Sequence, residues 1–339
     1  MSRNMTQAMA RVIEKANIVA NQNDNYTIFG DKDGISEKWL KNAKIVNQIR
    51  LFPDFYGAWI VYENENYLVL VNHNDDKFRI PNFLDNTTDI NSGCWAAIIS
   101  DLDLSLKKNI DTSRLEEVFG CGWETNDKGF KAIKFDESVD GFKFKDFFPD
   151  ITLYKIISRF TQKEELSQII GSILVTGDAY RLLPYTQSVI QKFKCIFDDG
   201  SKNIPFDNLL ASYVASEFKF AYLDLYRCME RLQPLYFLSG FYKKLSLNNK
   251  SLLEFCEEFY DTTKLSPSLE KSLEELLKSL LPVGINANKD LYKIRNQIVH
   301  LRPNQSNDLI PHGIQEWNEL ILNMLIIVKE LYHIHQDLF

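Results

Sequence analysis

The sequence predicts an α+β N-terminal domain with a mainly antiparallel sheet, followed by an all-α helical bundle. Between residues 58 and 135, β-branched and aromatic runs alternate with short polar segments, which is the pattern of paired strands. From residue 208 onward, apolar residues recur at steps of three and four, which is the pattern of amphipathic helices. A chain of 339 residues is also long for a single hydrophobic core, so we expect at least two domains.

The strand pattern assigns residues 1–150 to a mixed α/β domain. An amphipathic helix opens it, with one apolar face made of Met5, Met9, Val12, Ile13, Ala16 and Ala20. Two runs, 58–62 and 67–71, are joined by a short polar segment and predict a hairpin. Further strands are expected at 77–80, 94–99 and 130–135.

Helical patterns replace the strands after residue 150. A helical connector is predicted over 151–204, with a capping box at Thr161 and Glu164 and a second helix that Pro184 can open. The stretch 198–207 is rich in turn-forming residues and reads as a linker, so the last domain is placed at 205–339. Its predicted helices cover 208–237, 251–260, 268–281, 290–301 and 315–335. The first of these is apolar around most of its circumference, so we expect it to be buried on more than one side.

Composition restricts the classes of function. A formal net charge of −7 argues against broad, sequence-independent coating of nucleic acid, although a small basic site remains compatible with it. The five cysteines are scattered and include no C-x-x-C pair, which fits a reducing cytoplasm and predicts neither a disulfide framework nor a zinc site. The first twenty residues lack the apolar run of a signal peptide, and the longest apolar stretch is too short to span a bilayer. We therefore expect a cytoplasmic protein with no membrane role.

The segment 290–303 carries the residues best suited to chemistry. Read as a helix, it has one apolar stripe, made of Leu291, Ile294, Ile298 and Leu301. Arg295 falls inside this stripe, where a permanent charge must meet an anion or a partner. Asn296 and His300 are four residues apart and share one flank of the helix. Pro303 disfavours helical geometry just before it, so His300 lies near the helix C-terminus.

Arg295 and His300 together can bind an anion and transfer protons. His300 can serve as acid or base near neutral pH. Arg295 offers a planar fork of donors that matches phosphate. Asn296 could orient the imidazole or contact the phosphate.

The run Arg295-Asn296-x-x-x-His300 resembles the signature of HEPN-domain ribonucleases. The predicted helices of 205–339, with this run on the penultimate helix, are similar to the HEPN fold; the resemblance does not extend to the N-terminal domain. It implies a metal-independent endoribonuclease that needs no cofactor, cuts RNA and acts as a toxin or in abortive anti-phage defence. It also implies a homodimer in which two such motifs meet. Glu230 matches the acidic residue that the family often carries on a preceding helix, and the N-terminal domain would recognise a trigger, a regulatory partner or the RNA.

Three alternatives stay open at this point. Arg295 could simply pair with an internal acid while His300 caps a helix end, and Glu230 could be a solvated surface carboxylate between two arginines. The bundle would then be a catalytically silent HEPN module for binding or assembly. A metal enzyme centred on Asp101 and Asp103 is a further alternative, which would need more acidic residues nearby.

Overall fold

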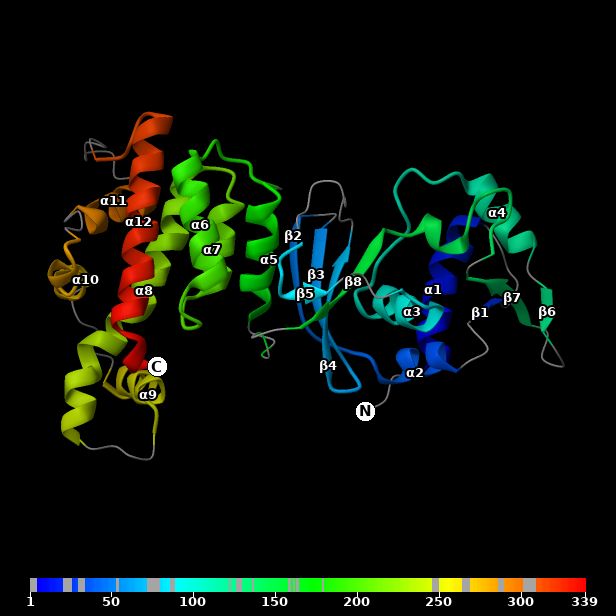
Figure 1. The fold of residues 1–339 in the computed structure, drawn as a ribbon, viewed down its shortest axis with the longest axis horizontal. Helices are drawn as coiled ribbons and strands as arrows, with labels where there is room; N and C mark the ends of the chain where they lie inside the picture. Colours follow the sequence, from blue (N-terminus) through cyan, green and yellow to red (C-terminus); the bar gives the residue numbers. More distant parts are fainter. Residues whose placement is uncertain are drawn as a thin grey trace. The chain divides into compact units, whose positions relative to one another are not determined.

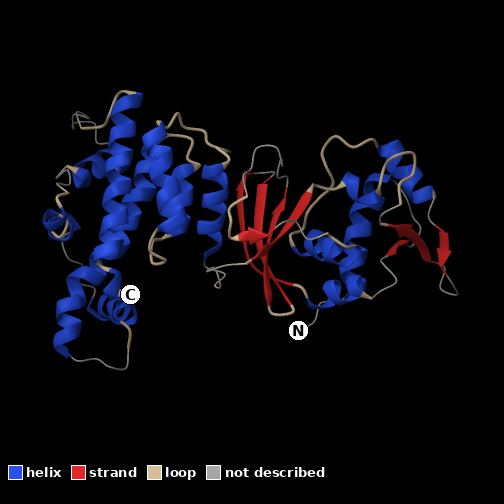
Figure 2. Ribbon diagram, viewed as in Figure 1, coloured by secondary structure: helices blue, strands red, loops and turns tan. Residues whose placement is uncertain are grey.

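The computed structural model divides the chain into two compact units between Leu166 and Ser167. It describes residues 5–339 except 21–25, 30–33, 53–54, 72–79, 86–88, 122, 126–129, 136, 158–159, 161, 163–164, 179, 246–249, 264–268, 286–289 and 301–308. Every described strand belongs to the N-terminal unit, and the C-terminal unit is built from helices (Figures 1 and 2). The predicted fold class, an α+β domain followed by a helical bundle, is confirmed.

A five-stranded antiparallel sheet in the order β2-β3-β4-β8-β5 forms one part of the N-terminal unit. Its strands are β2 (Lys44–Phe52), β3 (Phe55–Tyr62), β4 (Glu65–Val71), β5 (Leu84–Asp85) and β8 (Ile151–Ile156). The predicted hairpin is β3 and β4, whose turn residues Glu63 and Asn64 both have positive φ, at 49° and 65°. Two positive φ angles give the turn a twist that matches the twist of the paired strands.

Helices and a second, smaller sheet complete the N-terminal unit. The helices are α1 (Met5–Ala20), α2 (Ile35–Asn42), α3 (Ser92–Asp101) and α4 (Thr112–Gly120), with a 3-10 turn at Phe144–Phe147. The small sheet has the order β1-β7-β6, with β1 (Tyr26–Phe29) parallel to β7 (Phe130–Lys134) and β6 (Trp123–Thr125) antiparallel to β7. The predicted helix at the N-terminus and the strand near 130–135 are thus confirmed.

The segment 94–99 was predicted as a strand and is a helix, α3. Its apolar run shows no helical period because residues 92–100 are buried on every side, and a helix that is apolar all round gives the same pattern as a buried strand. The start signal is nevertheless present. Asn91 caps the helix by accepting a hydrogen bond from the backbone N–H of Cys94 at 2.8 Å. The strand predicted at 77–80 falls mainly on residues outside those described.

The predicted boundaries at residues 150 and 204 differ from the division at 166/167. Strand β8 pairs with β4 along five residue pairs, from Tyr67–Lys155 to Val71–Ile151, so 151–156 is part of the sheet rather than of a helical connector. The helices α5 (Leu166–Thr176) and α6 (Gln187–Asp199) contribute buried side chains to the C-terminal unit. The capping box predicted from Thr161 and Glu164 rests on residues outside the described range.

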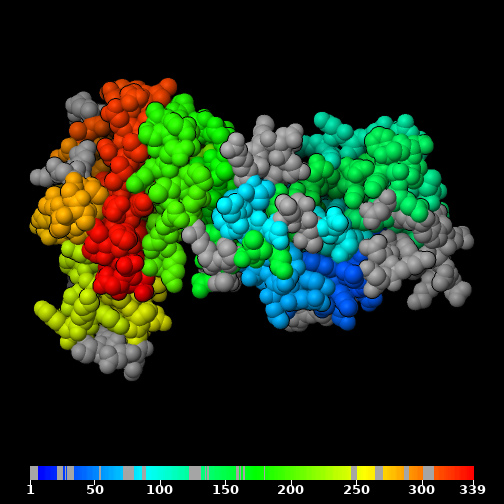
Figure 3. Space-filling model, in the orientation of Figure 1, coloured from blue at the N-terminus to red at the C-terminus, as the bar shows by residue number. Residues whose placement is uncertain are grey.

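The C-terminal unit is organised around α8 (Phe218–Leu245), which contacts five other helices. These are α7 (Phe206–Tyr213), α9 (Leu252–Thr263), α10 (Leu269–Lys278), α11 (Leu291–Val299) and α12 (Ile314–Ile334). Helix α12 also packs against α6, and the two surfaces meet in the space-filling view, where α12 is red and α6 green (Figure 3). Over the described residues, no helix combines the length and the apolar character needed to cross a membrane.

The stretch 198–207, predicted as an exposed linker, packs into the C-terminal unit instead. Asp198 accepts a hydrogen bond from Ser172 at 2.5 Å and forms an ion pair with Lys194. Ile204 and Phe206 are buried, and Asp207 accepts a hydrogen bond from the hydroxyl of Ser167. The turn-forming composition therefore marks a tight loop between two packed helices rather than a division between domains.

The helix predicted at 208–237 is two helices, α7 and α8, separated at residues 214–217. Its apolar circumference is used within the chain, because Tyr213, Tyr222, Leu225 and Met229 are fully buried. These side chains therefore offer no surface to a second copy of the chain, and any dimer must use other residues.

Candidate functional site

Helix α11 (Leu291–Val299) is shorter than the predicted 290–301, and half of the predicted apolar stripe is buried. Leu291 and Ile294 are buried, Ile298 is half-buried, and Leu301 lies outside the described residues. His300 is the first residue after the helix, with φ −112° and ψ 90°, and its backbone N–H donates to the Asn296 carbonyl at 2.8 Å. Arg295 and Asn296 thus lie in the last two turns of the helix, and His300 directly follows its end, near the C-terminus as predicted.

Arg295 meets an acid, as a charge in an apolar stripe must. Its Nη2 lies 3.5 Å from Glu230 Oε1, and its Nη1 donates to Asn296 Oδ1 at 3.1 Å. The side chains of Arg295 and Glu230 are 24% and 29% exposed, so the pair is neither fully buried nor fully solvated. A guanidinium has five N–H donors, and 24% of the Arg295 side chain is exposed. Its exposed part is accessible to an anion from solvent.

Two tyrosines of α8 form the buried side of this site. The hydroxyl of Tyr222 donates to the backbone carbonyl of Leu291 at 2.7 Å, which fixes the start of α11 against α8. Tyr226 is buried, and its burial raises the pKa of its hydroxyl. The charge of Glu230 raises this pKa further, while Arg295 opposes both effects. Tyr226 is thus a neutral phenol beside the ion pair.

His300 lies on the solvent side of the same helix end. The residue is exposed, whereas Arg295 and Asn296 next to it are half-buried. An exposed imidazole at this position can exchange protons with water or with a ligand. The arrangement therefore combines a half-buried guanidinium, an amide and an exposed imidazole at one helix end, which Tyr222 and Glu230 of α8 contact.

Arg295 contacts Glu230 and Asn296, and His300 follows at the same helix end, but the two tyrosines were not predicted as site residues. Tyr222 and Tyr226 precede Glu230 at steps of four, so all three share one face of α8. This spacing was a usable signal. It was hidden because the whole segment is rich in aromatic residues, so the two tyrosines did not stand apart from the core.

The acidic pair predicted for a metal enzyme does not form a cluster. Asp101 ends α3, and Asp103 follows it with φ 52°, where its carboxylate binds the ammonium of Lys15 at 2.7 Å. Lys15 holds the pKa of Asp103 below its usual value, chiefly through this hydrogen bond. Within the described ranges, no three His, Cys, Asp or Glu side chains are grouped so that they could hold a metal ion.

Comparison of the chain with known protein families, with curated proteins and with solved structures finds no match.

Proposed function

We propose that the protein is a metal-independent endoribonuclease that cuts RNA through attack of the 2′-hydroxyl on the adjacent phosphate. The observation that carries the proposal is the placement of Arg295, half-buried and held by Glu230 and Asn296, on the helix end that exposes His300. Arg295 would bind the phosphate and stabilise the charge that develops on it, and His300 would transfer protons. Glu230 and Asn296 would hold the guanidinium in position.

The test is RNA cleavage by the full chain and by single variants. Arg295→Ala and His300→Ala should each abolish cleavage, and Arg295→Lys should fail as well, because an ammonium cannot reproduce the bidentate fork. The matched controls are Arg231→Ala and His333→Ala, an exposed arginine of α8 and an exposed histidine of α12, which should cleave like the wild type.

Two further observations separate this mechanism from a metal-dependent one. Cleavage should survive EDTA, and the products should carry a 2′,3′-cyclic phosphate end. A substrate with a 2′-deoxy nucleotide at the cut site should resist cleavage, because it lacks the attacking hydroxyl. Undiminished cutting of the deoxy substrate, or full inhibition by the chelator, would contradict the proposal.

We propose that two copies of the chain assemble so that their α11 ends face each other. One arginine and one histidine make a sparse site, and a second pair would complete it. Several apolar side chains near this helix end are exposed, namely Val299 at 45%, Leu309 at 37% and Ile314 at 59%. Light scattering at micromolar concentration should give a dimer, and Val299→Lys should weaken it by placing a charge at its centre.

The biological setting proposed from the family resemblance is a cytoplasmic toxin or an abortive anti-phage effector. Growth of a host expressing the wild-type chain should then slow, and Arg295→Ala should relieve this effect. The N-terminal unit would act as the sensor or recognition part.

The second candidate function is a silent binding or assembly module, and the Arg295–Glu230 ion pair favours it. The only role of this ion pair could be to neutralise the charge of Arg295 inside the packed bundle, without any part in catalysis. If wild type, Arg295→Ala and His300→Ala are equally inert on RNA with and without candidate triggers, this second function becomes the better one.

A further inference from the structure

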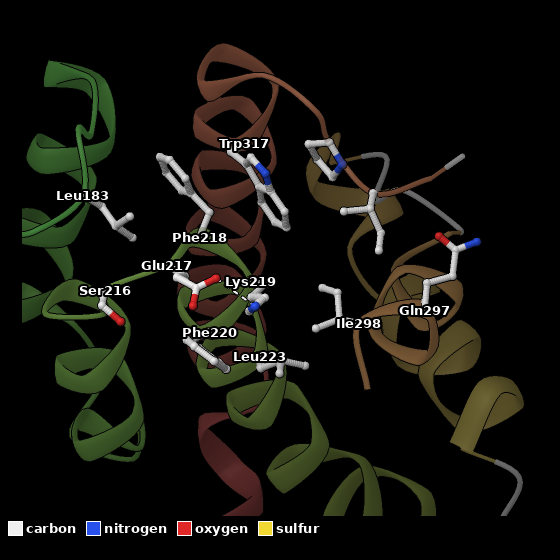
Figure 4. A pocket seen from close by; sticks show the side chains of 12 residues that line it. Leu183, Ser216, Glu217, Phe218, Lys219, Phe220, Leu223, Gln297, Ile298 and Trp317 are labelled. Carbon is white, nitrogen blue, oxygen red and sulfur yellow. Dashed lines mark ion pairs between the residues drawn. The ribbon is translucent and has the colours of Figure 1, made fainter. Parts of the chain in front are cut away.

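Beside the C-terminal end of α11, the C-terminal unit contains a pocket of about 670 Å³ (Figure 4). Its walls come from the start of α8, the start of α12 and the last two turns of α11. The lining side chains used below are Ser216, Glu217, Phe218, Lys219, Phe220, Gln297, Ile298 and Trp317. The volume is in the range of small-molecule sites, which are typically about 300–1,000 Å³.

Flat aromatic surfaces dominate the wall at the start of α8. Phe218 and Trp317 stack with ring centroids 5.9 Å apart and an angle of 7° between their planes. Phe220 is 45% exposed at the rim, and the ammonium of Lys219 lies over its ring, 5.0 Å from the ring centroid. Ile298 of α11 lies across the pocket from this wall (Figure 4). Such surfaces suit a flat ring, because aromatic platforms bind bases through their π-faces.

The polar groups of the pocket suit an uncharged ligand. Lys219 Nζ lies 2.8 Å from Glu217 Oε2, so the two charges offset each other. The pair and the hydroxyl of Ser216 offer both donors and acceptors. A phosphate would prefer an excess of positive charge, whereas the edge of a nucleobase carries donors and acceptors without net charge.

The pocket adjoins the proposed cleavage site. Ile298 lines the pocket and follows Arg295 by three residues on α11, and residues three apart are neighbours on the surface of an α-helix. A strand whose phosphate rests on Arg295 would therefore have a neighbouring base within reach of the pocket. We propose that this pocket holds one nucleobase of an RNA strand, stacked against Phe220, beside the phosphate at Arg295 and His300.

The proposal rests on the proposed function for its place in the reaction, but the binding of the base can be tested separately. The full chain with Arg295→Ala and His300→Ala together removes cleavage and leaves the pocket lining unchanged. Adenosine, cytidine, guanosine, uridine and a labelled 12-nucleotide RNA are titrated against it. Trp317 is the one tryptophan of the sequence after residue 123, so quenching of its emission, lost in Trp317→Phe, reports binding in this pocket.

The comparison that decides is Phe220→Ala against Phe237→Ala, two exposed phenylalanines of α8, of which only Phe220 lines the pocket. Phe220→Ala should weaken binding of at least one nucleoside and of the RNA about tenfold, which corresponds to about 1.4 kcal/mol. Phe237→Ala should change binding less than twofold. Equal effects of both variants, or no binding of any probe, would overturn the proposal.

A second measurement uses active wild-type protein and RNA with one abasic nucleotide beside the cut site. The missing base should raise KM about tenfold for wild type and cause little further loss in Phe220→Ala, because the two changes remove the same contact. If a free nucleoside competes with RNA, the pocket accepts a base from a free nucleoside as well as from an RNA strand. Nucleoside binding without any cleavage would remove the proposed function and keep the pocket. If cleavage depends on Arg295 but neither Phe220→Ala nor the abasic site changes it, the proposed function stands and the pocket proposal is overturned.

Discussion

At the scale of single residues, Glu230 tests whether the ion pair serves chemistry or only packing. Glu230→Gln keeps an oxygen that can accept from Arg295 but removes the charge. Both partners are about a quarter exposed, so the loss in unfolding free energy should stay within about 1 kcal/mol. If Glu230 positions the guanidinium, cleavage should fall about tenfold with a nearly normal thermal midpoint. A normal rate with a much lower midpoint would favour the packing function.

His335 should make the stability of the C-terminal unit depend on pH. It is buried at the end of α12, with its Nε2 2.9 Å from Ser279 Oγ and its ring 4.9 Å from that of Tyr236. Burial lowers its pKa, and the nearby Asp337 opposes this shift. The unfolded chain then binds a proton more readily than the folded one, so stability is lost as pH falls through the unfolded value of about 6.5.

The measurement is urea unfolding, followed by circular dichroism at pH 7.5 and at pH 5.5. Wild type should lose more stability between these two values than His335→Gln does. His333→Gln, which changes an exposed histidine two residues away, should keep the wild-type difference. If all three proteins lose the same free energy of unfolding between pH 7.5 and pH 5.5, the burial of His335 does not make stability depend on pH.

The residue scale also shows how far the sequence can predict a site. Arg295, Asn296 and His300 lie on one short helix, so their spacing alone places them together. Glu230 is 65 positions away from Arg295 in the sequence, and it was named through the family resemblance and the rule that a charge in an apolar stripe needs a partner. The pocket was not predicted, because Phe218, Gln297 and Trp317 come from three helices whose packing no local pattern determines.

At the scale of the elements, Gly93 permits the close packing of α2 and α3. A Cβ at this position would lie 1.7 Å from the backbone oxygen of Ser36, so the helices would have to move apart. Gly93→Ala should therefore lower the thermal midpoint of the N-terminal unit, at a typical overpacking cost of about 1–3 kcal/mol.

Gly120→Ala is the matched control, because it changes a glycine at the end of α4 that has no atom within 4 Å of its Cβ position. Alanine favours helix by about 1 kcal/mol over glycine, so this control should be neutral or stabilising. A Gly93→Ala protein as stable as Gly120→Ala would mean that α2 and α3 are not packed as the structure has them.

The same element explains the main error in predicting the fold. Residues 92–100 are buried on all faces, which leaves no period for a helix to show. The hairpin of β3 and β4, with one strand directly following the other, was predicted because its signal is local. Strand β8 was missed because its partner β4 lies about 80 residues earlier, and such pairing depends on the tertiary fold.

At the scale of the whole molecule, the division at 166/167 means that each unit has its own core. The C-terminal unit contains Arg295, His300, Glu230 and the pocket. Its helices are joined by internal hydrogen bonds from buried tyrosines, such as Tyr332 to the Cys228 carbonyl at 2.9 Å and Tyr185 to the Ser212 carbonyl at 2.8 Å. None of these contacts needs the N-terminal unit.

A fragment of residues 162–339 should therefore fold alone, with a helical circular dichroism spectrum and a cooperative thermal transition. A fragment of residues 205–339, which begins at the boundary predicted from the sequence, should fail. It lacks α5 and α6, whose side chains Ile169, Ile173, Phe193 and Phe197 are fully buried, and so it would expose the apolar surface that they cover.

If the shorter fragment folds as well as the longer one, the bundle begins at residue 205 and α5 and α6 are accessory. If neither folds, the C-terminal unit depends on the N-terminal one, and Arg295 and His300 must be tested only in the full chain.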